Sequence, residues 1–255
     1  SGYWIVGTVK AESGEAINGS KIIAYLDGKI PERLFRTQSD SGGNYTLKVA
    51  GAGKYVVHSE PTGEYVPDQK VALLECYGSV YKQAVVDFVH HEGECLVHGR
   101  VIDNETTKPV DGAAVSFFHY DPSGPSGHYE VFADSDGKFQ TCLPENSYGI
   151  RARAKGYVSY PCPMNVARSG DINSLQISKQ TAEQEILIEM LRGLAVRVVV
   201  NDPGGNPVEG AAVSVYSRDC DGDGHTDAKG ECVIDTLSKG SMMVIVQKTR
   251  GKQDQ

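Results

Sequence analysis

Apolar and polar residues alternate along many short stretches of this chain, with turn-forming residues between the stretches. The alternation is clearest in YGIRARA (148–154) and AVSVYS (212–217). A period of two is typical of a β-strand that buries one face. Gly, Pro and Asp separate the stretches, and no segment has a convincing pattern for a long helix. The sequence therefore predicts an all-β protein built from short antiparallel strands.

Two blocks of this pattern occur three times. The first block is a strand, a polar turn, an apolar-x-Gly step and a second strand; it spans 5–26, 96–120 and 194–216, with step glycines Gly19, Gly112 and Gly210. The second block is a D-x-x-G turn that leads into a strand; it spans 37–49, 132–143 and 225–237, with turn glycines Gly43, Gly137 and Gly230. Both sets of glycines recur in the same order at nearly constant spacing, which indicates internal repetition.

The repetition predicts three domains, at 1–93, 94–192 and 193–255. Each contains a further strand, within 53–66, 146–159 and 240–251. A last strand is predicted at 83–91 in the first domain and at 183–191 in the second, where a short helix over 178–191 is the alternative. The third domain has no counterpart, because its final apolar stretch is followed by the polar sequence TRGKQDQ.

These landmarks resemble the carboxypeptidase regulatory-like domain, a transthyretin-like β-sandwich. The resemblance rests on G-x-V followed by apolar-x-G-(A/S)-x-apolar and then (S/T)-D-x-x-G-x-apolar, and it covers nearly the whole chain. The landmarks are also similar to the B-type repeats of Gram-positive surface proteins. The resemblance implies three tandem seven-stranded transthyretin/immunoglobulin-like sandwiches, the third lacking its last strand. It implies no particular activity, because such modules mostly serve as stalks, spacers, adhesion modules or accessory domains.

An incomplete sandwich exposes apolar core and unpaired backbone groups, which is a template for pairing with another chain. The sequence therefore predicts that the third domain accepts a strand from a neighbouring copy. The alternating N-terminal segment SGYWIVGTV (1–9) is the predicted donor. Head-to-tail donation would build a homopolymer. The alternatives are a last strand lost to truncation or disorder, or a domain with fewer strands.

Bulk properties exclude several functional classes. The 255 residues carry a net charge of -8, and no Lys/Arg run exceeds two residues, so nucleic acid is not an expected partner. No apolar stretch is long enough to span a membrane. The chain begins directly in a strand-like segment, as expected of a mature secreted protein whose signal peptide has been removed. We therefore expect an extracellular or cell-surface location.

Six cysteines suit an oxidising compartment, and none forms a C-x-x-C pair that would indicate zinc or redox chemistry. Fifteen connectivities are open; neighbours in the sequence suggest Cys76–Cys95, Cys142–Cys162 and Cys220–Cys232. Three N-x-[ST] triplets mark Asn18, Asn44 and Asn104 as glycosylation candidates.

The segment DCDGDGHTD (219–227) is the candidate metal site. Its aspartates Asp219, Asp221 and Asp223 fall at positions 1, 3 and 5 of a calcium loop, with the His225 carbonyl at position 7 and Asp227 at position 9. Calcium prefers such oxygen ligands, but the glutamate expected at position 12 is replaced by Gly230. Structural Ca²⁺ and a plain solvated hairpin tip therefore both remain open, and a catalytic metal is not expected.

Enzymatic chemistry finds no support. His90 and His91 are adjacent on a predicted strand and face opposite sides, so the segment 89–98 is expected to be exposed polar sequence rather than a metal site. The second domain also resembles intradiol ring-cleaving dioxygenases, where Tyr129 and Tyr148 would match two iron ligands. The strand that should supply histidines reads IRARAKGYV and has none. Hydrolase and phosphate-loop motifs are absent.

The sequence thus predicts a non-enzymatic extracellular structural protein, a subunit of a filament, stalk or surface layer assembled by strand donation between chains. The alternative is an adhesion or accessory module that binds carbohydrate or protein. Its expected partners are copies of itself or a cell-surface protein or glycan.

Overall fold

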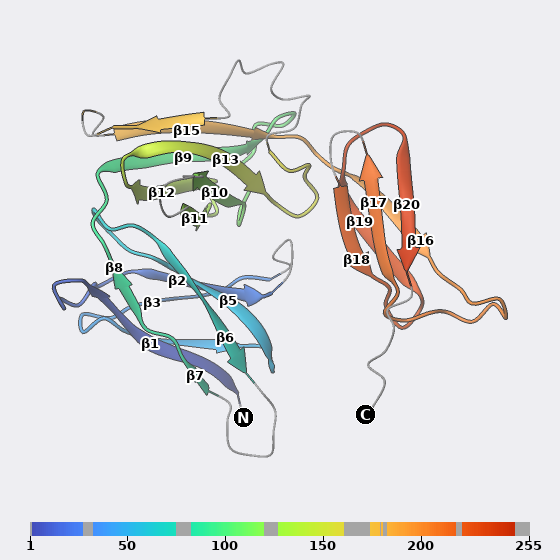
Figure 1. Cartoon of the computed structure of the whole chain (residues 1–255), viewed down its shortest axis with the longest axis horizontal. Coiled ribbons are helices and arrows are strands. Elements are labelled where there is room, and N and C mark those ends of the chain that lie inside the picture. The colour runs from blue at the N-terminus through green and yellow to red at the C-terminus, as the bar shows by residue number, and fades with distance from the viewer. Residues whose placement is uncertain are drawn as a thin grey trace.

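The computed structural model of the chain describes residues 2–27, 33–74, 83–119, 127–160, 174–178, 180, 183–217 and 221–247. Within these residues the chain forms strands and no helix, which confirms the predicted all-β class. The strands fall into three groups along the sequence, called here units 1, 2 and 3 (Figure 1).

Unit 1 packs two sheets around one core. Its strands are β1 (Tyr3–Ala11), β2 (Lys21–Leu26), β3 (Phe35–Gln38), β4 (Asn44–Val49), β5 (Gly53–Glu60), β6 (Asp68–Leu74), β7 (Gln83–Val85) and β8 (Phe88–His90). One sheet has the order β4-β1-β7, with β8 also paired to β1, and the other has the order β3-β2-β5-β6. The predicted last strand at 83–91 is therefore interrupted: β7 and β8 both run parallel to β1, on either side of Val86 and Asp87. The described residues of unit 1 thus form eight strands, where seven were expected.

Unit 2 has the same arrangement. Its strands are β9 (Cys95–Asp103), β10 (Ala114–His119), β11 (Gly127–Phe132), β12 (Lys138–Leu143), β13 (Asn146–Arg153), β14 (Ser174–Ile177) and β15 (Glu183–Met190). The sheets are β12-β9-β15 and β11-β10-β13-β14. The segment expected to be a strand rather than a helix is β15, which runs parallel to β9 over its whole length.

Unit 3 has five strands in the described residues. They are β16 (Leu194–Val199), β17 (Ala212–Ser217), β18 (Asp221–His225), β19 (Glu231–Leu237) and β20 (Met242–Gln247), in sheets β16-β19 and β18-β17-β20. Neither β14 nor β15 has a counterpart among them. Within the described residues, two strand positions of unit 2 thus have no equivalent in unit 3, where the sequence indicated one.

The repeated glycines occupy the same backbone conformation in each unit. Gly43, Gly137 and Gly230 have φ of 76°, 74° and 73°, and each donates its N–H to the carbonyl of the aspartate three residues before it. A Cβ on any of them would lie 2.4–2.5 Å from a carbonyl oxygen in the unit's first strand or, for Gly230, in the residue directly after it, Val200. Only glycine meets both conditions, because a positive φ strains other residues. The step glycines Gly19, Gly112 and Gly210 also agree, with φ between 70° and 73°.

A second type of glycine differs between the units. Gly7 in β1 and Gly99 in β9 each face an aromatic partner on the next strand, Tyr45 and Phe139. In unit 3 the equivalent pair is Val198 and Cys232. The total side-chain volume is kept, but it is moved from the second strand to the first.

Candidate functional site

The described part of the candidate calcium segment is a strand and not a coiled loop. Residues 221–225 form β18, which pairs antiparallel with β17. A Cβ on Gly222 would lie 2.3 Å from Ile234, and one on Gly224 would lie 2.6 Å from the Cys232 sulfur. Both glycines therefore face the core and let β18 approach the opposite sheet closely. Asp223 and His225 alternate with them and are exposed.

Asp227 belongs to the repeated turn rather than to a metal loop. Its Oδ1 accepts the backbone N–H groups of Lys229 at 2.8 Å and Glu231 at 2.9 Å, and these bonds hold its pKa below the usual value. The equivalent Asp40 and Asp134 accept the same pair of N–H groups. Asp219 lies outside the described residues, as does the Asp221 side chain. Among the described residues, no three His, Cys, Asp or Glu side chains form a group that could hold a metal ion. Because part of the candidate loop is not described, calcium binding stays a prediction.

Three of the six cysteines are described: Cys95, Cys142 and Cys232, all buried free thiols. Each predicted disulfide pairs one of them with Cys76, Cys162 or Cys220, which lie outside the described residues. Cys95 and Cys142 are on neighbouring strands, with Cys95 opposite Leu143. Burial raises the pKa of both thiols, so neither is an activated nucleophile. The pairing stays a prediction.

The glycosylation candidates differ in exposure. Asn18 and Asn44 are exposed and Asn104 is half-buried. The Asn44 side-chain amide already donates to Asp40 at 3.2 Å. Asn18 is therefore the most accessible of the three, and glycosylation at each stays a prediction.

The histidine pair at the end of unit 1 lies on opposite faces, as the alternation predicts. His91 is exposed and its Nδ1 lies 2.8 Å from Glu12. His90, in contrast, is 1% exposed, so the expectation of a wholly exposed polar segment is wrong there. Its Nδ1 lies 2.7 Å from the Val66 carbonyl and its Nε2 2.8 Å from the Ser59 hydroxyl. This Ser–His pair is sealed in the core, so it stabilises the fold and cannot meet a substrate.

The tyrosines matched to the dioxygenase ligands lie together in unit 2. The rings of Tyr129 and Tyr148 are 6.0 Å apart. Burial raises the pKa of both phenols, and the Tyr148 hydroxyl donates to the Pro144 carbonyl at 3.0 Å. An iron-bound tyrosine must be deprotonated, and this setting favours the protonated form.

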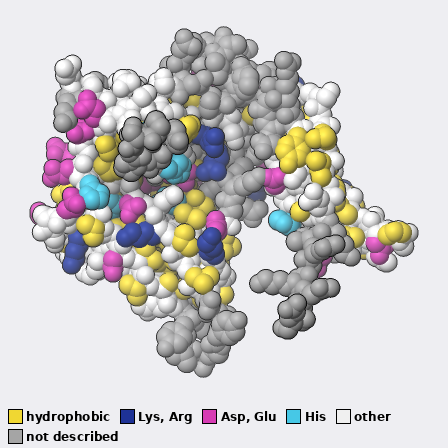
Figure 2. Space-filling model, viewed as in Figure 1, with side chains coloured by type: hydrophobic (Ala, Val, Ile, Leu, Met, Phe, Trp, Pro, Cys, Tyr) yellow, Lys and Arg dark blue, Asp and Glu magenta, His cyan; other side chains and the backbone are white. Residues whose placement is uncertain are grey.

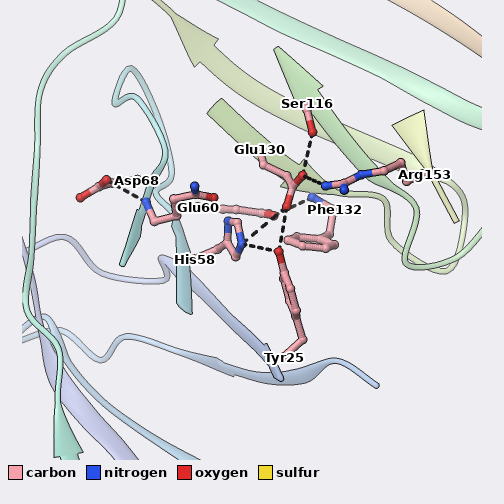
Figure 3. A network of polar contacts seen from close by, with 9 residues as sticks. Tyr25, His58, Glu60, Asp68, Ser116, Glu130, Phe132 and Arg153 are labelled. Atoms are coloured by element: carbon pink, nitrogen blue, oxygen red, sulfur yellow. Dashed lines mark hydrogen bonds and ion pairs between the residues drawn. The ribbon is translucent and has the colours of Figure 1, made fainter. Parts of the chain in front are cut away.

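A site that the sequence did not indicate lies between units 1 and 2. Ile23 and Tyr25 of β2 pack against Ala114 of β10 and Phe132 of β11 in a buried apolar cluster. Polar side chains surround this cluster and cross from one unit to the other (Figure 3). The junction between units 1 and 2 thus has a buried apolar centre with polar contacts around it.

Glu130 of β11 is the centre of this polar network, with a side chain only 1% exposed. Its Oε2 accepts from the Ser116 hydroxyl at 2.7 Å and from Arg153 at 3.0 Å, both in unit 2. Its Oε1 accepts from the Tyr25 hydroxyl of unit 1 at 3.3 Å and lies 3.6 Å from Nε2 of His58. Burial alone would raise the pKa of Glu130, but the hydrogen bonds from Ser116 and Arg153 and the positive charge of Arg153 oppose it, and that pKa is lowered.

Glu60 of unit 1 makes the reverse contact. Its Oε1 accepts the backbone N–H of Phe132 at 2.7 Å, which lies on β11, an edge strand of unit 2. Burial raises the pKa of Glu60 to about 7. Each unit therefore contributes one carboxylate to the other. Glu60 of unit 1 binds a backbone N–H on an edge strand of unit 2, and Glu130 of unit 2 contacts the side chains of Tyr25 and His58 in unit 1.

His58 lies between these carboxylates and stays neutral. Burial lowers the pKa of His58 to about 4, and its ring stacks on Tyr25 with centroids 5.5 Å apart. Its Nδ1 has no hydrogen-bond partner among the described residues. The pattern of β5, in which His58 and Glu60 alternate with Val57 and Ser59, was the only sequence signal of this site. Nothing local shows that the polar face is covered by another unit.

A polar cavity of about 350 Å³ lies beside the same junction. Arg36 and Lys155 line it together with Asp111, and Arg36 lies 3.8 Å from Asp111. The cavity gathers charges of both signs.

The second notable site is the uncovered side of unit 3. Val244 and Val246 of β20 pair with the buried Val215 and Val213 of β17, so they face the core, yet they are 45% and 42% exposed. The equivalent residues of unit 2, Ile150 and Ala152, are 1% and 0% exposed. Hydrophobic side chains gather on unit 3 in the space-filling view (Figure 2).

The predicted donor strand is not free. The N-terminal segment forms β1, which lies between β4 on one side and β7 and β8 on the other. Ile5 and Val9 are fully buried in the core of unit 1. Donating this strand would dismantle unit 1, so the prediction of an N-terminal donor is wrong. Both its edges are already occupied within its own chain.

No family model and no curated protein matches the chain. The resemblance to carboxypeptidase regulatory-like domains is therefore not confirmed.

Solved structures give distant similarities only. The chain is similar to the Bacillus anthracis TIE protein, at 13% identity over 96% of this chain and 44% of that one, with a TM-score of 0.30. It is similar to the Streptococcal ancillary pilin, at 15% identity over 74% and 62%, with a TM-score of 0.30. It is similar to shaft pilin SpaA from Lactobacillus rhamnosus GG, at 11% identity over 75% and 98%, with a TM-score of 0.31. The chain thus spans less than two thirds of the first two proteins, and scores of this size carry no inference about function. The described residues include no helix that could span a membrane.

Proposed function

We propose that this chain is a non-enzymatic structural subunit of an extracellular stalk or filament. In this role units 1 and 2 form a stiff body, and unit 3 joins the chain to a neighbour by accepting a β-strand. The proposal extends to a cell-surface location.

One observation carries the proposal: the core-facing residues of β20 are open where the same positions in unit 2 are sealed. Transfer of apolar surface from water is favourable by about 25 cal/mol per Å². Unpaired N–H and C=O groups on a strand edge also favour pairing with another strand. An added strand beside β20 satisfies both, as β6 does for β5 in unit 1.

A strand peptide supplied in trans tests this function. The peptide DQKVALL, the sequence of β6 (Asp68–Leu74), carries Ala72 and Leu74, which are 3% and 2% exposed in the core of unit 1. Added to the full chain at a concentration at which the chain is monomeric, it is expected to slow hydrogen exchange in the strands of unit 3. A control peptide with Ala72→Asp and Leu74→Asp should give no protection. If DQKVALL leaves exchange in unit 3 unchanged, unit 3 is not a strand acceptor.

A further inference from the structure

The two open edges of unit 3 lie on the same side of the unit. In unit 2 the strands β14 and β15 cover β13 and β9. The counterparts of β13 and β9 in unit 3 are β20 and β16, and in the described residues each has a partner on one side only. Given the incomplete third unit proposed above, the question is what kind of strand closes this side.

The β16 edge is not shaped like the first strands of the other units. A Cβ on Gly7 would lie 1.8 Å from the Val86 carbonyl oxygen, and one on Gly99 would lie 2.2 Å from that of Ile186. The closing strand therefore occupies the space that a side chain would fill. Val198 stands at this position in β16 and packs on the core of unit 3. The parallel strand that closes units 1 and 2 does not fit there in the same way.

The β20 edge has the properties of a strand that pairs with itself. Its sequence MMVIVQ holds no charged residue. Met243, Val244, Ile245 and Val246 are 57%, 45%, 37% and 42% exposed, so both faces of the strand are uncovered. The opposite edge of the same sheet, β18, reads DGDGH. Two copies of β18 would bring like charges together, whereas two copies of β20 would not.

The rest of the chain offers no comparable donor in its described part. The strands β6, β14 and β15 have suitable apolar alternation, but they close the sandwiches of units 1 and 2. These three strands also end their sheets, but β6 and β15 carry charged residues and β14 has only four residues. β20 differs from them because it is uncharged and its core-facing residues are uncovered. Antiparallel pairing of two identical strands is two-fold symmetric, and one axis perpendicular to the sheets also brings the two β16 edges face to face.

We propose that unit 3 is completed by unit 3 of a second copy, through antiparallel pairing of β20 with β20 of the partner. The two three-stranded sheets join into one continuous sheet, and the open sides of the two cores cover each other. This contact is closed and joins two chains tail to tail, so by itself it makes a two-chain stalk and not a filament. It differs from head-to-tail donation, which repeats without limit.

Sedimentation of the full chain tests the proposal. The native chain is expected to approach twice its mass of 27.5 kDa as concentration rises, and then to stop. Val244→Lys places a like charge from each copy at the joint and should leave a monomer. Val233→Lys is the matched control, because Val233 is 61% exposed on β19 and lies away from the joint; it should remain dimeric. Circular dichroism would verify that both variants keep their strands.

Hydrogen exchange identifies the strand involved. Amides of β20 should gain protection as the native chain is concentrated, and this gain should be lost in Val244→Lys. A monomer at every concentration, a mass that grows without limit, or an unchanged dimer of Val244→Lys would each overturn the symmetric pairing. The peptide experiment separates the strand-acceptor function from the symmetric pairing. If the chain is monomeric and DQKVALL protects unit 3, the pairing is wrong and the strand-acceptor function stands. If the chain is monomeric and DQKVALL gives no protection, both are wrong.

Discussion

At the scale of single residues, the repeated D-x-x-G turn shows how one glycine fixes a strand connection. Gly137 combines a positive φ of 74° with a position where a Cβ would lie 2.4 Å from the Val101 carbonyl oxygen. Gly156 has nearly the same φ, 77°, but nothing lies within 4 Å of its Cβ position. A side chain at Gly156 would therefore cost only the strain of a positive φ, whereas one at Gly137 would also clash with the Val101 carbonyl.

Alanine substitutions measure the two costs. Gly156→Ala should lower the free energy of unfolding of unit 2 by about 1 kcal/mol, the usual cost of a left-handed conformation. Gly137→Ala should lower it by about 3 kcal/mol or more, because the backbone must also move away from Val101. Urea denaturation of the full chain would measure both. Equal losses would show that the close approach to Val101 does not matter.

At the scale of elements, the junction of β2 and β5 with β11 contains two titrating groups with opposite effects. The folded pKa of Glu60 is raised to about 7 from 4.5. This group stabilises the folded junction below pH 4.5, and its contribution is lost as the pH rises to about 7. The folded pKa of His58 is lowered to about 4 from 6.5. This group stabilises the junction above pH 6.5, and its contribution is lost as the pH falls to about 4.

Between pH 4.5 and 6.5 the stabilisation from Glu60 falls as the pH rises, while the stabilisation from His58 grows. The two changes oppose each other, so the stability of the native junction should change little across that range. Each contribution amounts to about 3 kcal/mol at full extent. Glu60→Gln should remove one of them, so that stability falls on acidification. His58→Gln should remove the other, so that stability rises on acidification.

Urea denaturation at several pH values would measure both slopes. The charged neighbours Lys21, Arg36, Asp68, His128, Glu130 and Arg153 are unchanged in both variants. Slopes of the same sign in the two variants would contradict the assignment.

At the scale of the whole molecule, the two junctions differ in kind. Units 1 and 2 share a buried apolar cluster and exchange carboxylates. Units 2 and 3 are joined by the segment after β15, where Arg192 donates to the buried Asp103 at 2.6 Å and Gly193 donates its N–H to the Gly156 carbonyl at 2.8 Å. Backbone N–H bonds and the arginine overcome the effect of burial and hold the pKa of Asp103 well below its usual range.

Arg192→Ala should loosen unit 3 from the stiff pair formed by units 1 and 2. Small-angle X-ray scattering of the monomeric Val244→Lys background would show a broader distribution of overall dimensions. Arg197→Ala is the control, because Arg197 pairs with Glu231 inside unit 3. An unchanged scattering profile for Arg192→Ala would show that the backbone contacts alone hold the joint.

Much of the fold could be predicted from the sequence because it depends on local signals. Alternation of apolar residues places the strands, and the D-x-x-G turns require glycine at Gly43, Gly137 and Gly230 for reasons set within a few residues and one neighbouring strand. The same local logic places β15 as a strand. It left two interpretations open for 219–227, because aspartates alternating with glycines suit both a calcium loop and a strand whose glycines let two sheets approach.

The sequence by itself determined the class, the strands and the repeated turns. Only the tertiary structure decided the rest, since burial and pairing depend on segments far apart in the chain. Glu60, Glu130 and His58 meet because two units dock, and no local pattern records that contact. β1 cannot be donated because both its edges are taken. The meaning of Val198 becomes clear only by comparison with Gly7 and Gly99, which stand at the equivalent positions of units 1 and 2. Those glycines have no side chain and so leave room for the closing strand. In the described part of the chain, β20 pairs with β17 on one side only.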